Sequence, residues 1–293
     1  MITGVAFACL STSLGGMTVA LTRLIIIQTE PLSLAFLRYG IGAIVLFGII
    51  LAKFRFPRID IRDLVGLTVL GVVMFAGFPY CMARSLEETT AARGALVFAT
   101  MPMVTIILGA IFRVERLTWA KMLAVGVAIL GTAITLGESV DIVAPNAFRG
   151  DLYMFLGTVA ASSFNIFSRK YLIRYGTLPT LVYTMLIGVL VLFLLALAYE
   201  QPLNGSLNFD LDGWFVIFML AVPGGALMMF SWARALQLIS PTQATITIGL
   251  NPLTAILLGA WLLAEPVTLN VLAGTALILV AIILANWQPK SLE

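Results

Sequence analysis

The sequence predicts an all-α integral membrane protein in which ten transmembrane helices form two inverted five-helix repeats, with both termini in the cytoplasm. Three observations support this class: the composition, the number of long apolar segments and an internal similarity. The 293 residues are 61% hydrophobic and 11% charged, with a mean hydropathy of +1.06. A water-soluble domain of this size needs more polar surface. Most of the outer surface is therefore expected to face lipid.

Ten segments are long enough to span a membrane, since about 20 mainly apolar residues are needed to cross the hydrocarbon core. Charged residues or Gly and Pro breaks separate them. The first lacks a basic amino-terminal region, so we expect it to be a span rather than a cleaved signal. The ten segments lie near residues 3–23, 32–52, 64–83, 93–112, 119–137, 151–171, 178–199, 213–234, 242–263 and 267–287.

The stretch from Arg84 to Thr118 occurs twice, 150 residues apart and without a gap. Self-similarity at a fixed spacing indicates a repeated structural unit. We therefore expect a first repeat at 1–137, a linker at 138–149, a second repeat at 150–288 and a tail at 289–293 that is a candidate cloning scar. The identical residues are Ala83, Arg84, Leu86, Pro102, Ile106, Leu108, Gly109, Ala110, Glu115 and Thr118, which match Ala233, Arg234, Leu236, Pro252, Ile256, Leu258, Gly259, Ala260, Glu265 and Thr268.

The orientation follows from the basic residues in the short loops, which accumulate on the cytoplasmic side. With the amino terminus inside, twelve Lys and Arg residues lie in the cytoplasm and four outside. Because each repeat has five spans, the second copy must enter the membrane upside down relative to the first. Inverted repeats of this kind are typical of secondary transporters, with a substrate site near the membrane midplane between the halves.

Several functional classes are disfavoured by what the sequence lacks. It has no histidine, the commonest general base and metal ligand. Cys9 and Cys81 lie in apolar runs without metal-binding spacing, so they resemble buried small hydrophobes. The net charge of +3 is explained by membrane orientation rather than nucleic acid. We expect no catalytic residue, metal or cofactor. The expected partners are a small-molecule substrate and the lipid bilayer. The oligomeric state is open, and a monomer is compatible with the fold.

The carboxylates fall at span ends or in loops, so no central proton carrier is predicted. Glu115 and Glu265 are repeat-equivalent, and we interpret them as carboxylates near the positive ends of helices. Arg38 is the only cation well inside a span. It lies about 10 Å from its helix start, so we expect it to reach the outer interface and to serve structure or gating rather than ligand contact.

Polar residues follow one face of the first and sixth spans, which are repeat-equivalent. Most of them are expected to serve helix packing. Asn165 is bulkier and needs hydrogen-bond partners inside the membrane, which a cavity would supply. The two stripes are Ser11, Gly15, Thr18 and Thr22 in the first span and Thr158, Ser162, Asn165 and Arg169 in the sixth.

Four prolines interrupt spans at symmetric positions, which predicts kinks that act as gates or hinges. Each removes a backbone donor and frees a carbonyl one turn earlier, which is tolerated at depth beside a wet cavity. These candidate hinge residues are Pro79, Pro102, Pro223 and Pro252. Aromatic and thioether side chains gather in the same spans and predict an apolar pocket with a few hydrogen-bonding groups.

The second span opens with Glu-Pro-Leu-Ser-Leu-Ala-Phe-Leu-Arg-Tyr, and paired Pro and Leu-Gly-Ala blocks precede Glu115 and Glu265. With these motifs the doubled unit resembles the EamA type of the drug/metabolite transporter superfamily. Within that family the chain looks most like the YddG group of aromatic amino-acid exporters. This likeness implies a ten-helix basket with a central cavity, and it implies cavity roles for Thr12, Phe78, Tyr80, Phe98, Met101, Ser163, Asn165, Trp232, Ile248 and Asn251.

The sequence thus predicts a bacterial inner-membrane exporter of amino acids, aromatic or otherwise apolar, that works by alternating access. Export of drugs or other amphipathic metabolites is the alternative within the same class. From other classes, a lipid flippase would need a lateral opening and a basic head-group site, and a non-transporting scaffold would leave the inverted repeat unexplained. An enzyme would need paired acids, an activated nucleophile or a metal cluster, none of which the sequence offers.

Overall fold

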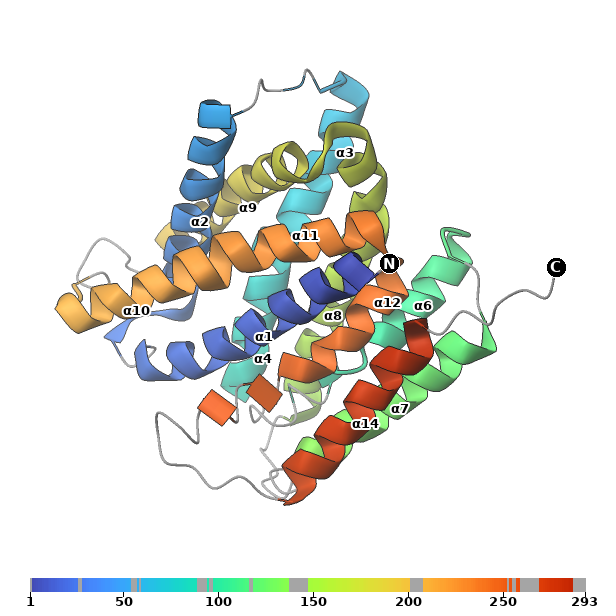
Figure 1. Cartoon of the computed structure of the whole chain (residues 1–293). Coiled ribbons are helices and arrows are strands. Elements are labelled where there is room, and N and C mark those ends of the chain that lie inside the picture. The colour runs from blue at the N-terminus through green and yellow to red at the C-terminus, as the bar shows by residue number, and fades with distance from the viewer. Residues whose placement is uncertain are drawn as a thin grey trace.

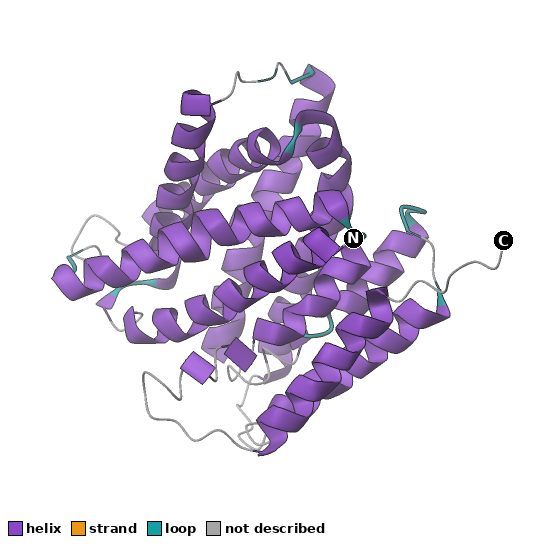
Figure 2. Cartoon of the chain, viewed as in Figure 1, coloured by secondary structure: helices purple, strands orange, loops and turns teal. Residues whose placement is uncertain are grey.

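A computed structural model of the chain describes residues 2–25, 28–53, 57, 59–88, 94, 97–115, 118–136, 147–200, 208–251, 253–254, 257–258 and 269–286. Over these residues the secondary structure is helical and contains no strand, as Figure 2 shows. The predicted all-α class is confirmed for this part of the chain.

The described residues of the first half form five helical runs of eleven or more residues, one of which includes a π-helical turn. Arg113 follows the end of α6 by two residues, and Gly137 directly follows α7 in the sequence. In chain order the elements are α1 (Ile2–Ile25), α2 (Pro31–Lys53), α3 (Ile61–Val72), the π-helical turn η2 (Val73–Gly77), α4 (Phe78–Glu88), α6 (Met101–Ile111) and α7 (Trp119–Leu136).

The second half repeats this order. The continuous run of α3, η2 and α4 spans residues 61–88, and its counterpart of α10, η4 and α11 spans residues 211–238, so both ends are displaced by 150 residues. The same displacement relates α7 to α14. The elements are α8 (Ala147–Tyr175), α9 (Thr177–Tyr199), α10 (Leu211–Ala221), the π-helical turn η4 (Val222–Leu227), α11 (Met228–Leu238), α12 (Pro241–Ile246), the 3₁₀ turn η5 (Thr247–Gly249) and α14 (Leu269–Asn286).

Helices from the two halves pack in pairs. Figure 1 shows α7 beside α14 at one edge of the molecule and α1 beside the long α10–α11 run. A Cβ on Gly131 of α7 would lie 2.9 Å from the carbonyl oxygen of Gly274 in α14, so glycine is needed for this close approach. Glu200, which directly follows α9, connects this helix to the start of α2. Its carboxylate accepts hydrogen bonds from the backbone N–H groups of Leu32 and Ser33 at 2.9 and 2.8 Å.

The pairs of α1 with α10–α11 and of α8 with α3–α4 are antiparallel. The start of α1 lies against the end of α11, because a Cβ on Gly4 would meet Ile239, while Thr18 further along α1 meets Gly224. In the same way α8 runs against the α3–α4 run. Its start places Arg149 at 3.5 Å from Glu88, and its end places Arg174 at 2.6 Å from Asp63.

Four helical stretches in the described part of the chain are long and apolar enough to cross a membrane: Pro31–Ala52, Ile61–Ser85, Thr177–Tyr199 and Leu211–Leu238. Their outer faces expose large apolar side chains such as Ile44 and Phe215. A contiguous apolar exterior is unfavourable in water and is the expected surface in lipid. The fold is therefore that of a multi-pass membrane protein.

Local signals fix several helix ends. Gly176, between α8 and α9, has a φ of 87°, a left-handed conformation that glycine adopts without steric cost. α12 begins with a capping box in which the Ser240 side chain accepts from the Gln243 backbone and the Gln243 side chain accepts from the Ser240 backbone. α10 begins at Asp210, whose side chain accepts a hydrogen bond from the Gly213 backbone at 2.8 Å.

Candidate functional site

Asn165 lies at the centre of a buried polar cluster built by three helices. Its side-chain oxygen accepts a hydrogen bond from the Trp232 indole Nε1 at 2.8 Å, and its Nδ2 donates to the Met101 sulfur at 3.6 Å. The three side chains are 1%, 7% and 3% exposed, respectively. A buried amide requires such partners. The sequence predicted each of these residues as a site residue, and the structure brings all three together from α8, α11 and α6.

Three buried hydroxyl groups without partners lie close in sequence to this cluster. Ser162 precedes Asn165 by one helical turn, Ser231 is next to Trp232, and Thr105 follows Met101 by one turn. All three residues are fully buried, and their side-chain oxygens have no hydrogen-bond partner. Unpaired buried polar groups are costly, so each of these hydroxyls has unused hydrogen-bonding capacity. Ser231 and Thr105 are not predicted from the sequence, since a single hydroxyl in an apolar span carries no local signal.

Aromatic and apolar side chains border the cluster. The centroids of the Phe78 and Phe98 rings lie 5.6 Å apart and the rings are tilted by 34°, a separation within the range of favourable aromatic pairs. Phe78, Phe98 and Ile248 pack into the same hydrophobic core as Met101 and Trp232. The predicted apolar surroundings of a site therefore lie together in space.

The remaining predicted site residues are more dispersed. Thr12 donates to the carbonyls of Ala8 and Cys9 in its own helix at 3.0 Å, and Ser163 donates to Val159 at 2.7 Å. Both hydroxyl groups therefore donate their hydrogen bonds to backbone carbonyls of their own helices. Tyr80 packs instead against a separate apolar cluster that includes Leu32 and Leu192. Its position next to Phe78 and Pro79 in the sequence does not place it beside the Asn165 cluster.

Asn251 lies against α1. A Cβ added to Gly15 would come within 2.7 Å of the Asn251 side-chain oxygen, which is buried and has no hydrogen-bond partner. Gly15 therefore makes room for this amide, and the close approach supports the predicted packing role of the stripe in the first span. The unpaired oxygen of Asn251 retains its capacity to accept a hydrogen bond.

The prolines mark irregular backbone rather than simple kinks. Pro223 is the second residue of the π-helical turn η4, and Pro79 follows η2 by two residues. Turns of this type are rare and are often found at functional sites. Pro102 is the second residue of α6, directly after a turn at Ala99–Thr100. It starts a helix, as proline does readily, and does not bend a continuous one as predicted. Pro252 lies outside the described residues.

Arg38 does not extend along α2 toward the predicted outer interface. Its Nη2 donates to the carbonyl oxygen of Gly224 in η4 at 2.9 Å and contacts the Met228 sulfur at 3.7 Å. Gly224 is about 20 Å from either end of the α10–α11 run, at 1.5 Å per residue. The guanidinium group therefore lies near the middle of that run, and the expectation that it snorkels is wrong.

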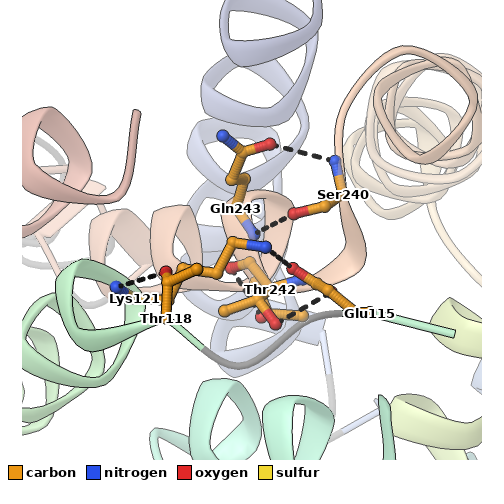
Figure 3. A network of polar contacts seen from close by, with 7 residues as sticks. Glu115, Thr118, Lys121, Ser240, Thr242 and Gln243 are labelled. Atoms are coloured by element: carbon orange, nitrogen blue, oxygen red, sulfur yellow. Dashed lines mark hydrogen bonds and ion pairs between the residues drawn. The ribbon is translucent and has the colours of Figure 1, made fainter. Parts of the chain in front are cut away.

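Glu115 joins the end of α6 to the beginnings of α7 and α12 (Figure 3). Its carboxylate pairs with Lys121 and accepts hydrogen bonds from the Thr242 backbone N–H at 3.2 Å and the Thr242 hydroxyl at 3.0 Å. The Lys121 and Glu115 side chains are 17% and 6% exposed. The carboxylate lies near a helix start as predicted, but that helix is α12 in the other half. Glu265 lies outside the described residues.

Comparisons with known proteins identify the class. The sequence profile of the EamA-like transporter family matches residues 2–137 and 148–287. Among curated proteins, the chain is 25% identical over 275 residues to the "uncharacterized transporter YyaM" of Bacillus subtilis (strain 168), covering 92% of this chain and 89% of that one. It is 29% identical over 255 residues to an "uncharacterized transporter" of Archaeoglobus fulgidus, covering 86% and 87% of the two chains.

Two further comparisons agree with this class. The chain is 22% identical over 275 residues to the "uncharacterized inner membrane transporter YedA" of Escherichia coli (strain K12), covering 92% of this chain and 86% of that one. A solved crystal structure with 18% identity superposes with a TM-score of 0.84 over 98% of this chain and 97% of that chain, which supports the fold alone. The chain belongs to the EamA-like transporter family, within the drug/metabolite transporter superfamily.

Proposed function

We propose that the chain exports amino acids, with aromatic or other apolar side chains favoured, across a bacterial inner membrane by alternating access. The observation that carries this proposal is the cluster of Asn165, Trp232 and Met101. It combines one amide, one indole and one thioether in an otherwise apolar interior. A small amphipathic solute needs few hydrogen-bonding groups and extensive apolar contact.

The polar groups near the cluster suit a zwitterion. Ser162, Ser231 and Thr105 have buried hydroxyls without partners, and irregular backbone in η2 and η4 can present carbonyl oxygens at membrane depth. No group of three or more His, Cys, Asp or Glu residues that could hold a metal occurs in the described part of the chain. The hydroxyl and carbonyl groups near the cluster offer hydrogen bonds to such a solute within an apolar surface.

The architecture supports two halves that move against each other. We propose residues 1–137 and 150–288 as the inverted halves, with 138–149 as their linker and both termini in the cytoplasm. The antiparallel pairing of α1 with α10–α11 and of α8 with α3–α4 supports an inverted repeat, because each pair combines one helix from each half. Repeats of this kind move as units around a fixed site.

Reconstitution into liposomes tests the proposal. Purified protein in liposomes loaded with labelled phenylalanine, tryptophan or leucine should release the label faster than empty liposomes do, and Asn165→Leu should slow this release. Thr132→Val is the matched control, since Thr132 is buried in α7 and bonds only to Ala128 of its own helix. Absence of flux for every amino acid overturns the substrate class. Flux of an amphipathic drug or of a labelled lipid would replace it with the exporter alternative or the flippase.

A further inference from the structure

The Arg38 guanidinium is a partly buried cation with an incomplete set of partners. A guanidinium has five N–H donors, but the described contacts use Nη2 alone, which reaches Gly224 and Met228. The Nε atom is buried and has no hydrogen-bond partner. The Tyr39 ring lies 5.1 Å from Cζ and offers a weak cation–π contact.

No carboxylate in the described part of the chain pairs with Arg38. The ion pairs found there involve Arg84, Lys121, Arg149 and Arg174, which lie toward helix ends. A cation near the middle of a membrane span is costly unless an anion or several acceptors compensate it. One carbonyl oxygen and one sulfur satisfy only part of this requirement, so the group retains capacity for an anionic ligand.

We propose that Arg38 binds the carboxylate of the transported solute. A carboxylate has two acceptor oxygens whose spacing matches adjacent guanidinium donors, and such paired, charge-assisted contacts are strong. This inference rests on the proposed amino-acid transport and names the chemical group that is recognised. It gives Arg38 of α2 a role in ligand binding, whereas the sequence favoured a role in structure or gating.

The position of Arg38 agrees with an elongated solute that bridges two contacts. Met228, which touches the guanidinium, is followed one helical turn later by Trp232 of the Asn165 cluster. One turn advances 5.4 Å, which is comparable to the separation of the carboxylate and the ring in phenylalanine. A carboxylate at Arg38 therefore allows an apolar side chain to extend toward Trp232 and Met101.

Two substitutions separate ligand binding from a purely structural role. Arg38→Gln keeps a donor but removes the charge, and Arg38→Lys keeps the charge but removes the planar fork. Arg169→Gln is the matched control, because Arg169 also donates from a partly buried guanidinium to a helix carbonyl, that of Leu236 at 3.1 Å.

The measurement is the ligand-induced rise in unfolding temperature of the purified protein. Four probes differ only in their polar groups: phenylalanine, its amide, phenethylamine and 3-phenylpropionate. The two carboxylates should protect the wild type and the Arg169→Gln variant. In Arg38→Gln the carboxylate concentration for half-maximal protection should rise about tenfold or more, whereas phenethylamine should act as before.

Equal protection of wild type and Arg38→Gln by 3-phenylpropionate would overturn the inference. The inference would also be overturned if phenethylamine or the amide raised the unfolding temperature of the wild type more than the carboxylates do. This second test uses only the wild type, so it applies even if Arg38→Gln fails to fold. The transport proposal is tested by a different result. If carboxylates protect the protein through Arg38 but no amino acid crosses the liposome membrane, the anion site is supported and the transport proposal is wrong. If amino acids are transported and Arg38→Lys and Arg38→Gln keep the carboxylate selectivity of the wild type, the transport proposal stands and the Arg38 site is wrong.

Discussion

The indole Nε1 of Trp232 donates a hydrogen bond to the side-chain oxygen of Asn165 across 2.8 Å, which ties α11 to α8. Both side chains are buried, so neither has water as an alternative partner. Because the indole holds the oxygen end of the amide, the Asn165 Nδ2 is directed toward the Met101 sulfur. The pair thus sets the orientation of the amide in the proposed site.

Asn165→Leu is expected to destabilise the protein by about 1–3 kcal/mol, because it leaves the buried indole N–H without a partner. Replacing both partners, in Asn165→Leu with Trp232→Phe, should recover part of that loss, since no unpaired donor remains. Amino-acid efflux should stay low in both variants, because the amide is absent. Thermal unfolding and liposome efflux measure the two effects, and a double variant that regains full efflux would show that the amide has only a packing role.

Gly224→Ala is expected to destabilise the contact between α1 and η4. The new Cβ would lie 2.3 Å from the Thr18 Cγ2, a distance that real contacts do not permit. Overpacking of this kind typically costs about 1–3 kcal/mol. Thr18→Ser removes the clashing methyl group and keeps a hydroxyl for the bond to Gly15, so the double variant should regain most of the lost stability in thermal unfolding.

Gly126→Ala is the control for that experiment. Gly126 is exposed in α7, and a Cβ there would meet nothing within 4 Å. Alanine favours the helix by about 1 kcal/mol over glycine, so this variant should be unchanged or slightly more stable. A loss of stability equal to that of Gly224→Ala would mean that the close approach to Thr18 is not the cause.

The helices could be predicted well because apolar length alone determines them. The expected spans at 119–137 and 178–199 correspond to Trp119–Leu136 and Thr177–Tyr199. The span expected at 93–112 differs, since a turn at residues 99–100 precedes Met101–Ile111. Proline permits either a kink or a helix start, and tertiary packing decides between them.

The candidate site could be predicted only residue by residue. Asn165 and Trp232 are separated by 67 positions, and no local pattern indicates that one donates to the other. Phe78 and Tyr80 are neighbours in the sequence but pack into different apolar clusters. The position of Arg38 along α2 predicted that its side chain would reach the membrane interface. Its guanidinium instead donates to a carbonyl of η4, a contact that depends on how α2 and η4 pack together and that the sequence does not indicate.

Glu115→Ala is expected to cost about 3 kcal/mol, because it leaves the Lys121 ammonium and the Thr242 hydroxyl without their shared acceptor in a mostly buried position. Glu115→Gln keeps an acceptor for Thr242 and loses only the charge pair, so its loss should be smaller. Adding Lys121→Met to Glu115→Ala should restore part of the stability by removing the uncompensated cation. Thermal unfolding ranks the variants, and equal losses for Ala and Gln would show that the contact with Thr242 contributes nothing.

Tyr175 is expected to titrate above its ordinary range. Its hydroxyl donates to the Asp63 carboxylate at 2.7 Å at the end of α8, beyond the predicted span at 151–171. This hydrogen bond to Asp63 is the main cause that raises the pKa of Tyr175, and partial desolvation adds to it. Because the pKa is higher in the folded state, the stabilisation is complete below about pH 10, the ordinary tyrosine value, and is lost as the pH rises through the folded pKa.

The phenolate absorbance of the wild type minus that of Tyr175→Phe isolates this group. The difference should develop only at a pH above the ordinary tyrosine range. Asp63→Asn removes the negative acceptor, so it should move the Tyr175 transition to lower pH. An Asp63→Asn protein whose Tyr175 titrates as in the wild type would mean that the carboxylate does not hold the phenol proton.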